Sequence, residues 1–168
     1  LTRLHQQNHT VDPLGGKKIS FGLVRFANID PLVAVARELI RLGAETGQRI
    51  HLCVYHSRHP LLVRSAIEQC LDRLLNRKNP QAIFADAEVQ QRLADHPETD
   101  HLFVVLATAV AEVGRDHDYD WAIIEPSSMR SIIQLAGRVR RHRPEPYKTP
   151  NLLLLDSNLS VQRLADML

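Results

Sequence analysis

Short apolar runs and amphipathic segments alternate along most of the chain. The apolar runs are nearly continuous in Val, Ile and Leu, which is typical of parallel strands covered on both faces. They predict strands at 19–27, 49–56, 101–107, 121–125 and 151–156. Segments with helical apolar spacing predict helices at 30–47, 59–78, 86–96, 128–141 and from about 160 onward. The alternation predicts an α/β fold with a doubly wound, mainly parallel sheet of about five strands and helices on both faces.

The two ends of the chain differ from this pattern. Residues 1–18 are polar and contain Asp12-Pro13 and Gly15-Gly16, so they are predicted to be a linker or loop. Residues 19–156 then form one lobe, and 157–168 a terminal helix that leads out of it. Because the first residue is Leu rather than Met, we expect the chain to be a piece of a longer protein.

Composition narrows the class of protein. The 168 residues suit one domain, and 44% hydrophobic with 24% charged residues is typical of a soluble globular protein. No apolar run approaches the roughly 18 residues that a membrane span needs, so we expect a cytoplasmic protein without a membrane partner. Only 5% of residues are aromatic, which favours backbone contacts over base stacking if the chain binds a single strand.

Several kinds of catalytic and metal site lack their sequence patterns. The nine histidines show no HExxH spacing, and Cys53 and Cys70 are far apart, so no metal site is predicted and the thiols are expected to be reduced, small apolar residues. No GxSxG motif supports a serine hydrolase. The "GGKK" at 15–18 lacks the Ser or Thr that follows the lysine of a phosphate loop.

Polar residues follow the predicted strands, where open α/β sheets bind ligands. They are Asn28, His56-Ser57-Arg58, the segment 107–118 and the segment 125–128. Asn28 and Ser128 also fit the role of turn or helix-cap residues, and His56 and Arg58 also fit that of solvated side chains. Both interpretations stay open at this point.

The segment 130–143 holds five arginines and no acidic residue, although the net charge is only +2. At about 100° per residue, Gln134, Arg138 and Arg141 fall on one face of the predicted helix. Met129, Ile132, Ala136 and Val139 are predicted to form the opposite, core face. Planar guanidinium groups bind phosphate oxygens well, so this face is interpreted as a polyphosphate contact, with a solvated helix end as the alternative.

The neighbouring residues are given other roles. Gly137 lies beside the face of Gln134, Arg138 and Arg141 and would let a ligand approach closely. Arg140 and Arg143 are assigned to surface or interlobe contacts.

The pattern Gln134-x-x-Gly137-Arg138-x-x-Arg141 resembles the sixth motif of superfamily 2 helicases. The upstream "TAVAEVGRD" (108–116) is similar to their fifth motif, in the variant of CRISPR-associated helicases. "FANIDPLVAVARELI" and "VYHSRHPLLVRSAIEQ" resemble the first strand-helix unit and the fourth motif of the same lobe. The likeness runs from about residue 19 to 143 and points to the second, C-terminal RecA-like lobe of the helicase-nuclease of type I CRISPR interference, in its type I-F form.

The resemblance implies a role for each matching residue. Arg138 and Arg141 would act as arginine fingers on the γ-phosphate, supported by Gln134. Gly114, Asp116 and Gly137 would lie against the nucleotide. Thr108 would contact the translocating strand, and His56, Ser57 and Arg58 would belong to a DNA-contacting or lobe-coupling loop. Leu135 stands where many relatives have Arg, which removes one usual polar contact.

The resemblance also implies cofactors and partners. ATP and Mg²⁺ would be bound mainly by a first RecA-like lobe, and the metal ions of an HD nuclease domain would lie outside this chain. The partners would be single-stranded DNA, these two domains of the same protein and an RNA-guided surveillance complex, with adaptation proteins and a phage inhibitor as further candidates. The whole protein would unwind and degrade foreign DNA, and the fragment alone is predicted to be inactive.

Two other functions fit parts of the pattern. A non-catalytic RecA-like module could use the arginines to bind nucleic acid or a protein. A small-molecule enzyme on a Rossmann-like sheet would need a glycine-rich turn after the first strand, where "FANIDP" stands instead.

Overall fold

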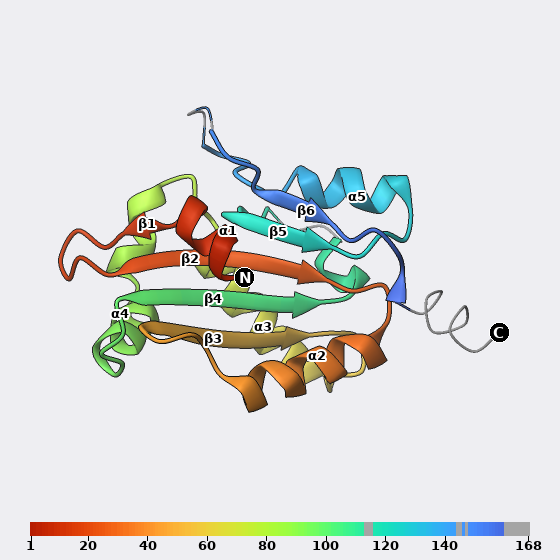
Figure 1. Cartoon of the computed structure of the whole chain (residues 1–168), viewed down its shortest axis with the longest axis horizontal. Helices are drawn as coiled ribbons and strands as arrows, with labels where there is room; N and C mark the ends of the chain where they lie inside the picture. Colours follow the sequence, from red (N-terminus) through yellow and green to blue (C-terminus); the bar gives the residue numbers. More distant parts are fainter. Residues whose placement is uncertain (113–115, 144–145, 147, 160–168) are drawn as a thin grey trace.

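Five parallel strands form the centre of the computed structural model, which describes residues 1–112, 116–143, 146 and 148–159. The strands lie in the order β3-β4-β2-β5-β6 (Figure 1). Their bounds are β2 Lys18–Arg25, β3 Gln48–Tyr55, β4 Asp100–Ala107, β5 Trp121–Ile124 and β6 Leu152–Leu154. A two-residue strand, β1 (Thr10–Val11), pairs with β2 in the antiparallel direction. The predicted α/β fold with a mainly parallel sheet is confirmed.

Helices cover both faces of this sheet (Figure 1). They are α1 Thr2–Asn8, α2 Ile29–Leu42, α3 Leu61–Leu74, α4 Ala87–Ala94 and α5 Met129–Ala136, with 3-10 turns η1 Pro80–Ala85 and η2 Ala109–Glu112. Residues from α1 and α2 pack with Val24 and Trp121 on one face, and residues from α3, α4 and α5 pack with Phe21 and Leu23 on the other. Neighbouring strand residues therefore serve opposite cores, as the period of two requires.

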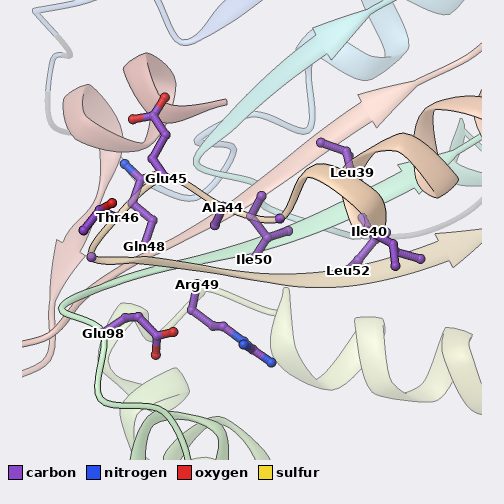
Figure 2. A pocket seen from close by; sticks show the side chains of 12 residues that line it. Leu39, Ile40, Ala44, Glu45, Thr46, Gln48, Arg49, Ile50, Leu52 and Glu98 are labelled. Carbon is purple, nitrogen blue, oxygen red and sulfur yellow. The ribbon is translucent and has the colours of Figure 1, made fainter.

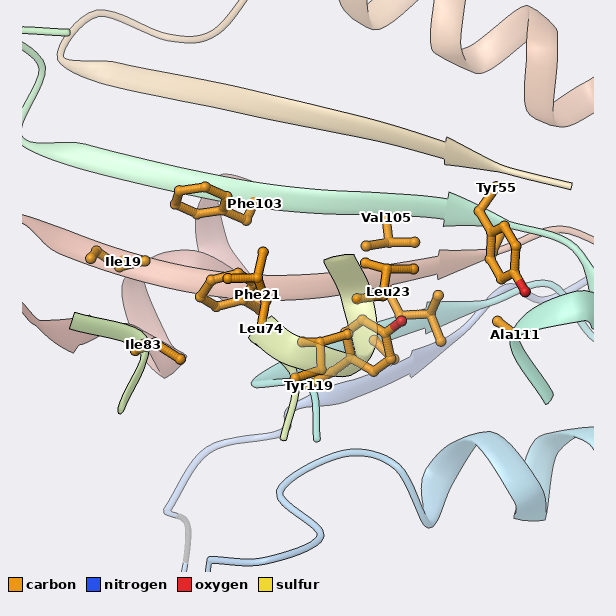
Figure 3. Close-up of a cluster of buried hydrophobic side chains, with 14 of the residues drawn as sticks. Ile19, Phe21, Leu23, Tyr55, Leu74, Ile83, Phe103, Val105, Ala111 and Tyr119 are labelled. Atoms are coloured by element: carbon orange, nitrogen blue, oxygen red, sulfur yellow. The ribbon is translucent and has the colours of Figure 1, made fainter. Parts of the chain in front are cut away.

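The core under α3 and α4 is built around aromatic rings (Figure 3). The rings of Phe21 and Phe103, on neighbouring strands β2 and β4, stack with centroids 4.7 Å apart. On the other face the Trp121 ring lies over Gly22, where an added Cβ would come within 2.1 Å of ring atoms. A glycine inside a strand often marks such a close approach, so Gly22 is required by packing.

The prediction that residues 1–18 form a linker or loop is corrected by the structure. Helix α1 packs on the sheet through Leu4 and His5, which are 2% and 0% exposed. His5 lies 2.7 Å from Ser20 Oγ and 3.0 Å from Asp100 Oδ1 through its two ring nitrogens. The hydropathy pattern missed this helix because a polar histidine, satisfied by polar partners, occupies a buried position.

The predicted helix 128–141 is also corrected, because α5 ends at Ala136. Beyond Gly137 the backbone pairs with residue 119 instead: the Tyr119 amide donates to the Arg138 carbonyl at 2.8 Å, and the Arg140 amide to the Tyr119 carbonyl at 2.9 Å. Arg140 has a φ of 52°, in the left-handed region that L residues seldom adopt. The helix therefore ends five residues earlier than the arginine spacing suggested.

Other boundaries shift by a few residues. Helix α2 begins after Asn28 rather than after Asp30, and ends before Gly43. Helix α3 ends at Leu74 rather than at 78. Ser128 caps α5 by accepting the Ser131 amide, as its cap interpretation predicted. The predicted terminal helix from about 160 lies outside the described residues.

A hollow of about 540 Å³ opens between the end of α2 and the start of β3 (Figure 2). Its lining includes Leu39 and Ile40 of α2, the turn 43–47 and Arg49 and Ile50 of β3. This is the amino-terminal edge of the parallel strands. Ligands of open α/β sheets bind at the other edge, where Ser57, Arg58 and Thr108 lie.

Candidate functional site

A hollow of about 570 Å³ lies at the carboxyl ends of β2, β3 and β4. We name it the carboxyl-edge hollow; it is lined by residues 27–30, Ser57, Arg58 and residues 108–110. Three residues with a predicted DNA contact, Ser57, Arg58 and Thr108, thus share one surface although 50 positions separate Arg58 from Thr108. Parallel pairing of β3 with β4, in which Tyr55 is opposite Ala107, brings the two segments together.

The charged and polar groups of this hollow differ in exposure. Arg58 has a side chain 68% exposed, and its Nη1 lies 3.2 Å from Asp30 Oδ1 at the start of α2. Thr108 is buried at the start of η2, where its carbonyl accepts the Ala111 amide at 3.1 Å. The long, solvated guanidinium of Arg58 is therefore the group best able to reach a phosphate.

His56, the fourth residue with a predicted DNA contact, packs against a histidine. Its ring stacks on His59 with centroids 4.0 Å apart and planes within 5°. Desolvation and the neighbouring His59 lower the pKa of His56. The ring is thus held neutral, which suits a role in shaping the loop better than a charged contact with phosphate.

The predicted shared face of Gln134, Arg138 and Arg141 is not formed, because the last two residues lie beyond the end of α5. Gln134 is exposed on α5, Arg138 is 6% exposed, and the Arg141 side chain is 45% exposed. Arg138 donates from Nη2 to the Glu112 carbonyl at 2.9 Å. The two arginines therefore differ in access to solvent.

The core face predicted for this helix is also corrected in part. Met129 and Ala136, predicted to face the core, are exposed instead, and Leu135 is fully buried.

Asp116 and Arg141, from the two predicted nucleotide motifs, are in contact. Asp116 Oδ1 lies 3.0 Å from Arg141 Nε and 3.1 Å from His142 Nε2, and its Oδ2 lies 3.6 Å from Lys78 Nζ. Desolvation acts to raise the pKa of Asp116, but the hydrogen bond from His142 and the charges of His142 and Arg141 together outweigh it and lower the pKa. An ionised carboxylate thus holds an exposed guanidinium. Gly114, predicted beside them, lies outside the described residues.

The assignment of Arg143 to surface or interlobe contacts is corrected, because its side chain is 7% exposed. Its Nη2 lies 2.6 Å from Asp118 Oδ1, and its Nη1 contacts Asp120 Oδ1. Asp120 also pairs with buried Arg77 at 3.3 Å and accepts the Phe21 amide at 2.6 Å. Burial acts to raise the pKa of Asp120, but Arg77 and Arg143 outweigh it and lower the pKa. Arg143 therefore anchors the segment 138–143 to the sheet.

Gly137 is exposed and adopts φ −66° and ψ 0°, a conformation open to any residue. A Cβ added here would meet backbone oxygens of residues 133 and 134 at 3.6 Å, an ordinary contact distance. The fold of this chain therefore does not require a glycine at 137. Close approach by another molecule, which the sequence predicted, is therefore a reason for a glycine at this position.

A buried ionic group, to which the sequence pattern assigns no role, lies beside Arg138. Arg25, 4% exposed at the end of β2, donates from Nε to Glu112 Oε1 at 2.9 Å, and Ser131 Oγ donates to the same oxygen. A charged residue at the end of an otherwise apolar strand was the available signal. Glu112 lies inside the segment that resembles the fifth motif.

The described residues contain neither a cluster of metal ligands nor a membrane-spanning helix. In the described part of the chain, no three His, Cys, Asp or Glu side chains are grouped as a metal ion would require. Of the helices in the same residues, none has both the length and the apolar character to cross a membrane.

Comparison with known proteins gives consistent matches. The family model described as "CRISPR-associated nuclease/helicase Cas3, C-terminal" matches residues 18–144. The chain is 59% identical over 158 residues to the CRISPR-associated nuclease/helicase Cas3 subtype I-F/YPEST of Pseudomonas aeruginosa, covering 93% of this chain and 14% of that protein. It is 53% identical over 167 residues to the protein of the same name from Pectobacterium atrosepticum, covering 98% and 15%.

A solved structure has the same fold. The crystal structure of T. fusca Cas3 matches with a TM-score of 0.61 at 24% identity, over 94% of this chain and 15% of that one. The chain thus spans about one seventh of the length of the proteins that it matches.

Proposed function

The chain belongs to the family of C-terminal regions of the CRISPR-associated nuclease/helicase Cas3, and on that premise we propose that it is the second RecA-like lobe of an ATP-dependent DNA helicase-nuclease. The whole protein would move along single-stranded DNA, unwind it and degrade foreign DNA in type I CRISPR interference. This lobe would supply the arginine fingers and part of the DNA track. A first RecA-like lobe would bind most of ATP and Mg²⁺.

The observation that carries this proposal is the contact between the two predicted nucleotide motifs. Asp116 and Arg141 are 25 positions apart, yet their side chains meet at 3.0 Å in an exposed position. A guanidinium that is solvated and oriented by one carboxylate is available to a phosphate that arrives from outside. Exposed Gln134 and Gly137 lie on the segment just before it. These groups fit half of a nucleotide site that a second lobe would complete.

The proposed chemistry needs little covalent help from the protein. Phosphoryl transfer to water is accelerated mainly by charge stabilisation, and an arginine finger contributes roughly 10³ to 10⁵ in rate. Arg141 would bring its positive charge to the γ-phosphate when the two lobes close. Arg138, buried against Glu112, would line the inner part of the same site. Hydrolysis would then depend on lobe closure, which would move the lobe relative to the bound strand.

The first test is ATP hydrolysis by the full-length protein with Arg141→Ala. We expect turnover to fall by at least about 10³ while affinity for single-stranded DNA stays within about threefold. Arg141 is the sharper probe than Arg138, since its exposed side chain can be removed without leaving a buried cavity. Arg37→Ala, an exposed arginine on α2, is the matched control. Parallel loss of hydrolysis and DNA binding would instead favour the non-catalytic nucleic-acid-binding module.

The second test concerns the carboxyl-edge hollow, where Ser57, Arg58 and Thr108 would hold the phosphate backbone and His56 would shape the loop. Arg58→Ala should weaken binding of single-stranded DNA about equally for all sequences, and should reduce the slope of log affinity against log salt by about one. Fluorescence anisotropy at several salt concentrations measures both. A loss confined to particular sequences would argue against a backbone contact.

The partners proposed for the whole protein follow from the family. Relatives carry the name CRISPR-associated nuclease/helicase, which supports an RNA-guided surveillance complex as the recruiting partner. The HD nuclease domain and its metal ions would lie in parts of the protein outside this chain. Adaptation proteins and a phage inhibitor are further partners that pull-down with full-length protein would test.

A further inference from the structure

Glu112 joins three elements at the carboxyl edge of the sheet. Its Oε1 accepts hydrogen bonds from Arg25 Nε at the end of β2, at 2.9 Å, and from Ser131 Oγ on α5. The same oxygen forms an ion pair with Arg25 Nη2 at 2.8 Å. Its backbone carbonyl accepts Arg138 Nη2 at 2.9 Å. One residue of η2 thus contacts a core strand, the sixth-motif helix and a proposed arginine finger.

Arg25 is itself held in a fixed position. It is 4% exposed, and its Nη1 donates to the Glu125 carbonyl at 3.1 Å. The fully buried Glu125 carboxylate accepts the Ala27 amide at 2.7 Å, and Ala27 lines the carboxyl-edge hollow. The ionic group therefore reaches from the rim of that hollow to Arg138.

The position of Glu112 in η2 ties it to the proposed DNA contact as well. Thr108 directly precedes this 3-10 turn, and its carbonyl accepts the Ala111 amide at 3.1 Å. A single hydrogen-bonded turn therefore separates Thr108 from Glu112. The turn therefore fixes the position of Glu112 relative to Thr108.

A contribution to folding stability is a weak explanation for the buried ion pair between Arg25 and Glu112. Replacing a buried ion pair by well-packed apolar residues is often neutral or stabilising, because desolvation offsets the attraction. This pair lies between two proposed ligand sites. Its geometry serves to hold groups in place, which is what a catalytic arrangement needs from the residues behind it.

We propose that Glu112 is a positioning residue for ATP hydrolysis: bound by Arg25 and Ser131, it holds Arg138 at a fixed place relative to Thr108. This inference rests on the proposed function of the lobe. Glu112 itself does not contact the reacting atoms. Its effect is exerted through Arg138.

The test measures kcat and KM for ATP, and affinity for single-stranded DNA, in the full-length protein with Glu112→Ala. A misplacement of about 1 Å can cost about a hundredfold in rate, so we expect kcat to fall by at least about tenfold. KM and DNA affinity should stay within about threefold. Glu112→Gln keeps the hydrogen-bond acceptor and should recover kcat to within about threefold of wild type. Glu45→Ala, an exposed glutamate at the opposite edge, is the control.

Other results would overturn the inference. They are a kcat of Glu112→Ala within twofold of wild type, an equal fall of kcat and DNA affinity, or no recovery with Glu112→Gln. If Glu112→Ala does not fold, Ser131→Ala can be used instead, because it removes only one hydroxyl. It should still lower kcat about threefold, a value expected for one lost hydrogen bond. An unchanged kcat would refute the inference.

The outcomes also separate this inference from the proposed function. Absence of DNA-stimulated hydrolysis in the wild type would refute the proposed function. An active wild type with an inactive Arg138→Ala and an active Glu112→Ala would refute only this inference.

Discussion

At the scale of single residues, the four arginines between 138 and 143 have different environments. Arg141 is exposed against Asp116, Arg138 is buried against Glu112, and Arg143 is enclosed by Asp118 and Asp120. Helical spacing alone places Arg140 and Arg143 together at the surface. It cannot show that Asp118 and Asp120, which precede β5, contact Arg143. That contact depends on a chain path set by tertiary packing.

The buried position of Arg143 gives a stability prediction. Arg143→Ala leaves Asp118 and Asp120 with less compensation in a buried site, so we expect a loss of about 3 to 5 kcal/mol in unfolding free energy. Arg130→Ala, at an exposed position on α5, should change it by no more than about 0.5 kcal/mol. Urea unfolding of the chain measures both variants. Equal stabilities would show that Arg143 is not an anchor.

Two glycines provide a matched pair of substitutions. Gly22→Ala places a methyl group against the buried Trp121 ring and should destabilise the chain by about 1 to 3 kcal/mol. Gly137→Ala meets no such clash, so its unfolding curve should match that of the wild type. In the full-length protein it should nevertheless slow ATP turnover if a ligand approaches the backbone there. Normal turnover by a stable Gly137→Ala variant would remove Gly137 from the proposed site.

At the scale of elements, the hydropathy pattern predicted the five strands because each is an almost uninterrupted apolar run. It failed where polar groups carry the structure. Helix α1 was missed because His5 occupies a buried position through Ser20 and Asp100. The end of α5 was missed because arginines have good helix propensity, whereas the backbone after Gly137 pairs with Tyr119.

The start of α5 was predicted better than its end, since a serine cap is a local signal. Ser128 Oγ accepts the Ser131 amide at 3.1 Å. Ser128→Ala should therefore cost about 1 kcal/mol in unfolding free energy. Ser128→Asp keeps an acceptor and should restore most of it, measured by the same denaturation. A fully stable alanine variant would mean that the cap contributes nothing.

At the scale of the whole molecule, parallel strands bring functional segments together at one edge. Ser57, Arg58 and Thr108 meet there because β3 and β4 run side by side, so the strand-end rule located the candidate DNA contacts from sequence. The Glu112 group was not predictable in this way. Its partners come from β2, η2 and α5, and no local period relates them.

Buried histidines should make the stability of the whole chain depend on pH. Burial lowers the pKa of His5 and His101, and burial with the nearby charge of His101 lowers the pKa of His51 to about 3. Unfolded histidines titrate near 6.5, so as pH falls below about 6.5 the unfolded chain binds more protons than the folded one. Stability is then fully present above about pH 6.5 and falls as pH decreases, by up to about 1.4 kcal/mol per pH unit for each histidine.

Urea unfolding at several pH values between 4 and 8 would measure this slope. His51→Phe should flatten it, because phenylalanine cannot take up a proton and can keep the stacking on Phe103, whose ring centroid lies 4.4 Å away. His51 and His101 lie in β3 and β4, and the carboxyl ends of these strands hold the predicted DNA contacts. Acid should therefore destabilise the strands that form the carboxyl-edge hollow together with the rest of the fold. A flat profile for the wild type would mean that these histidines become solvated without unfolding.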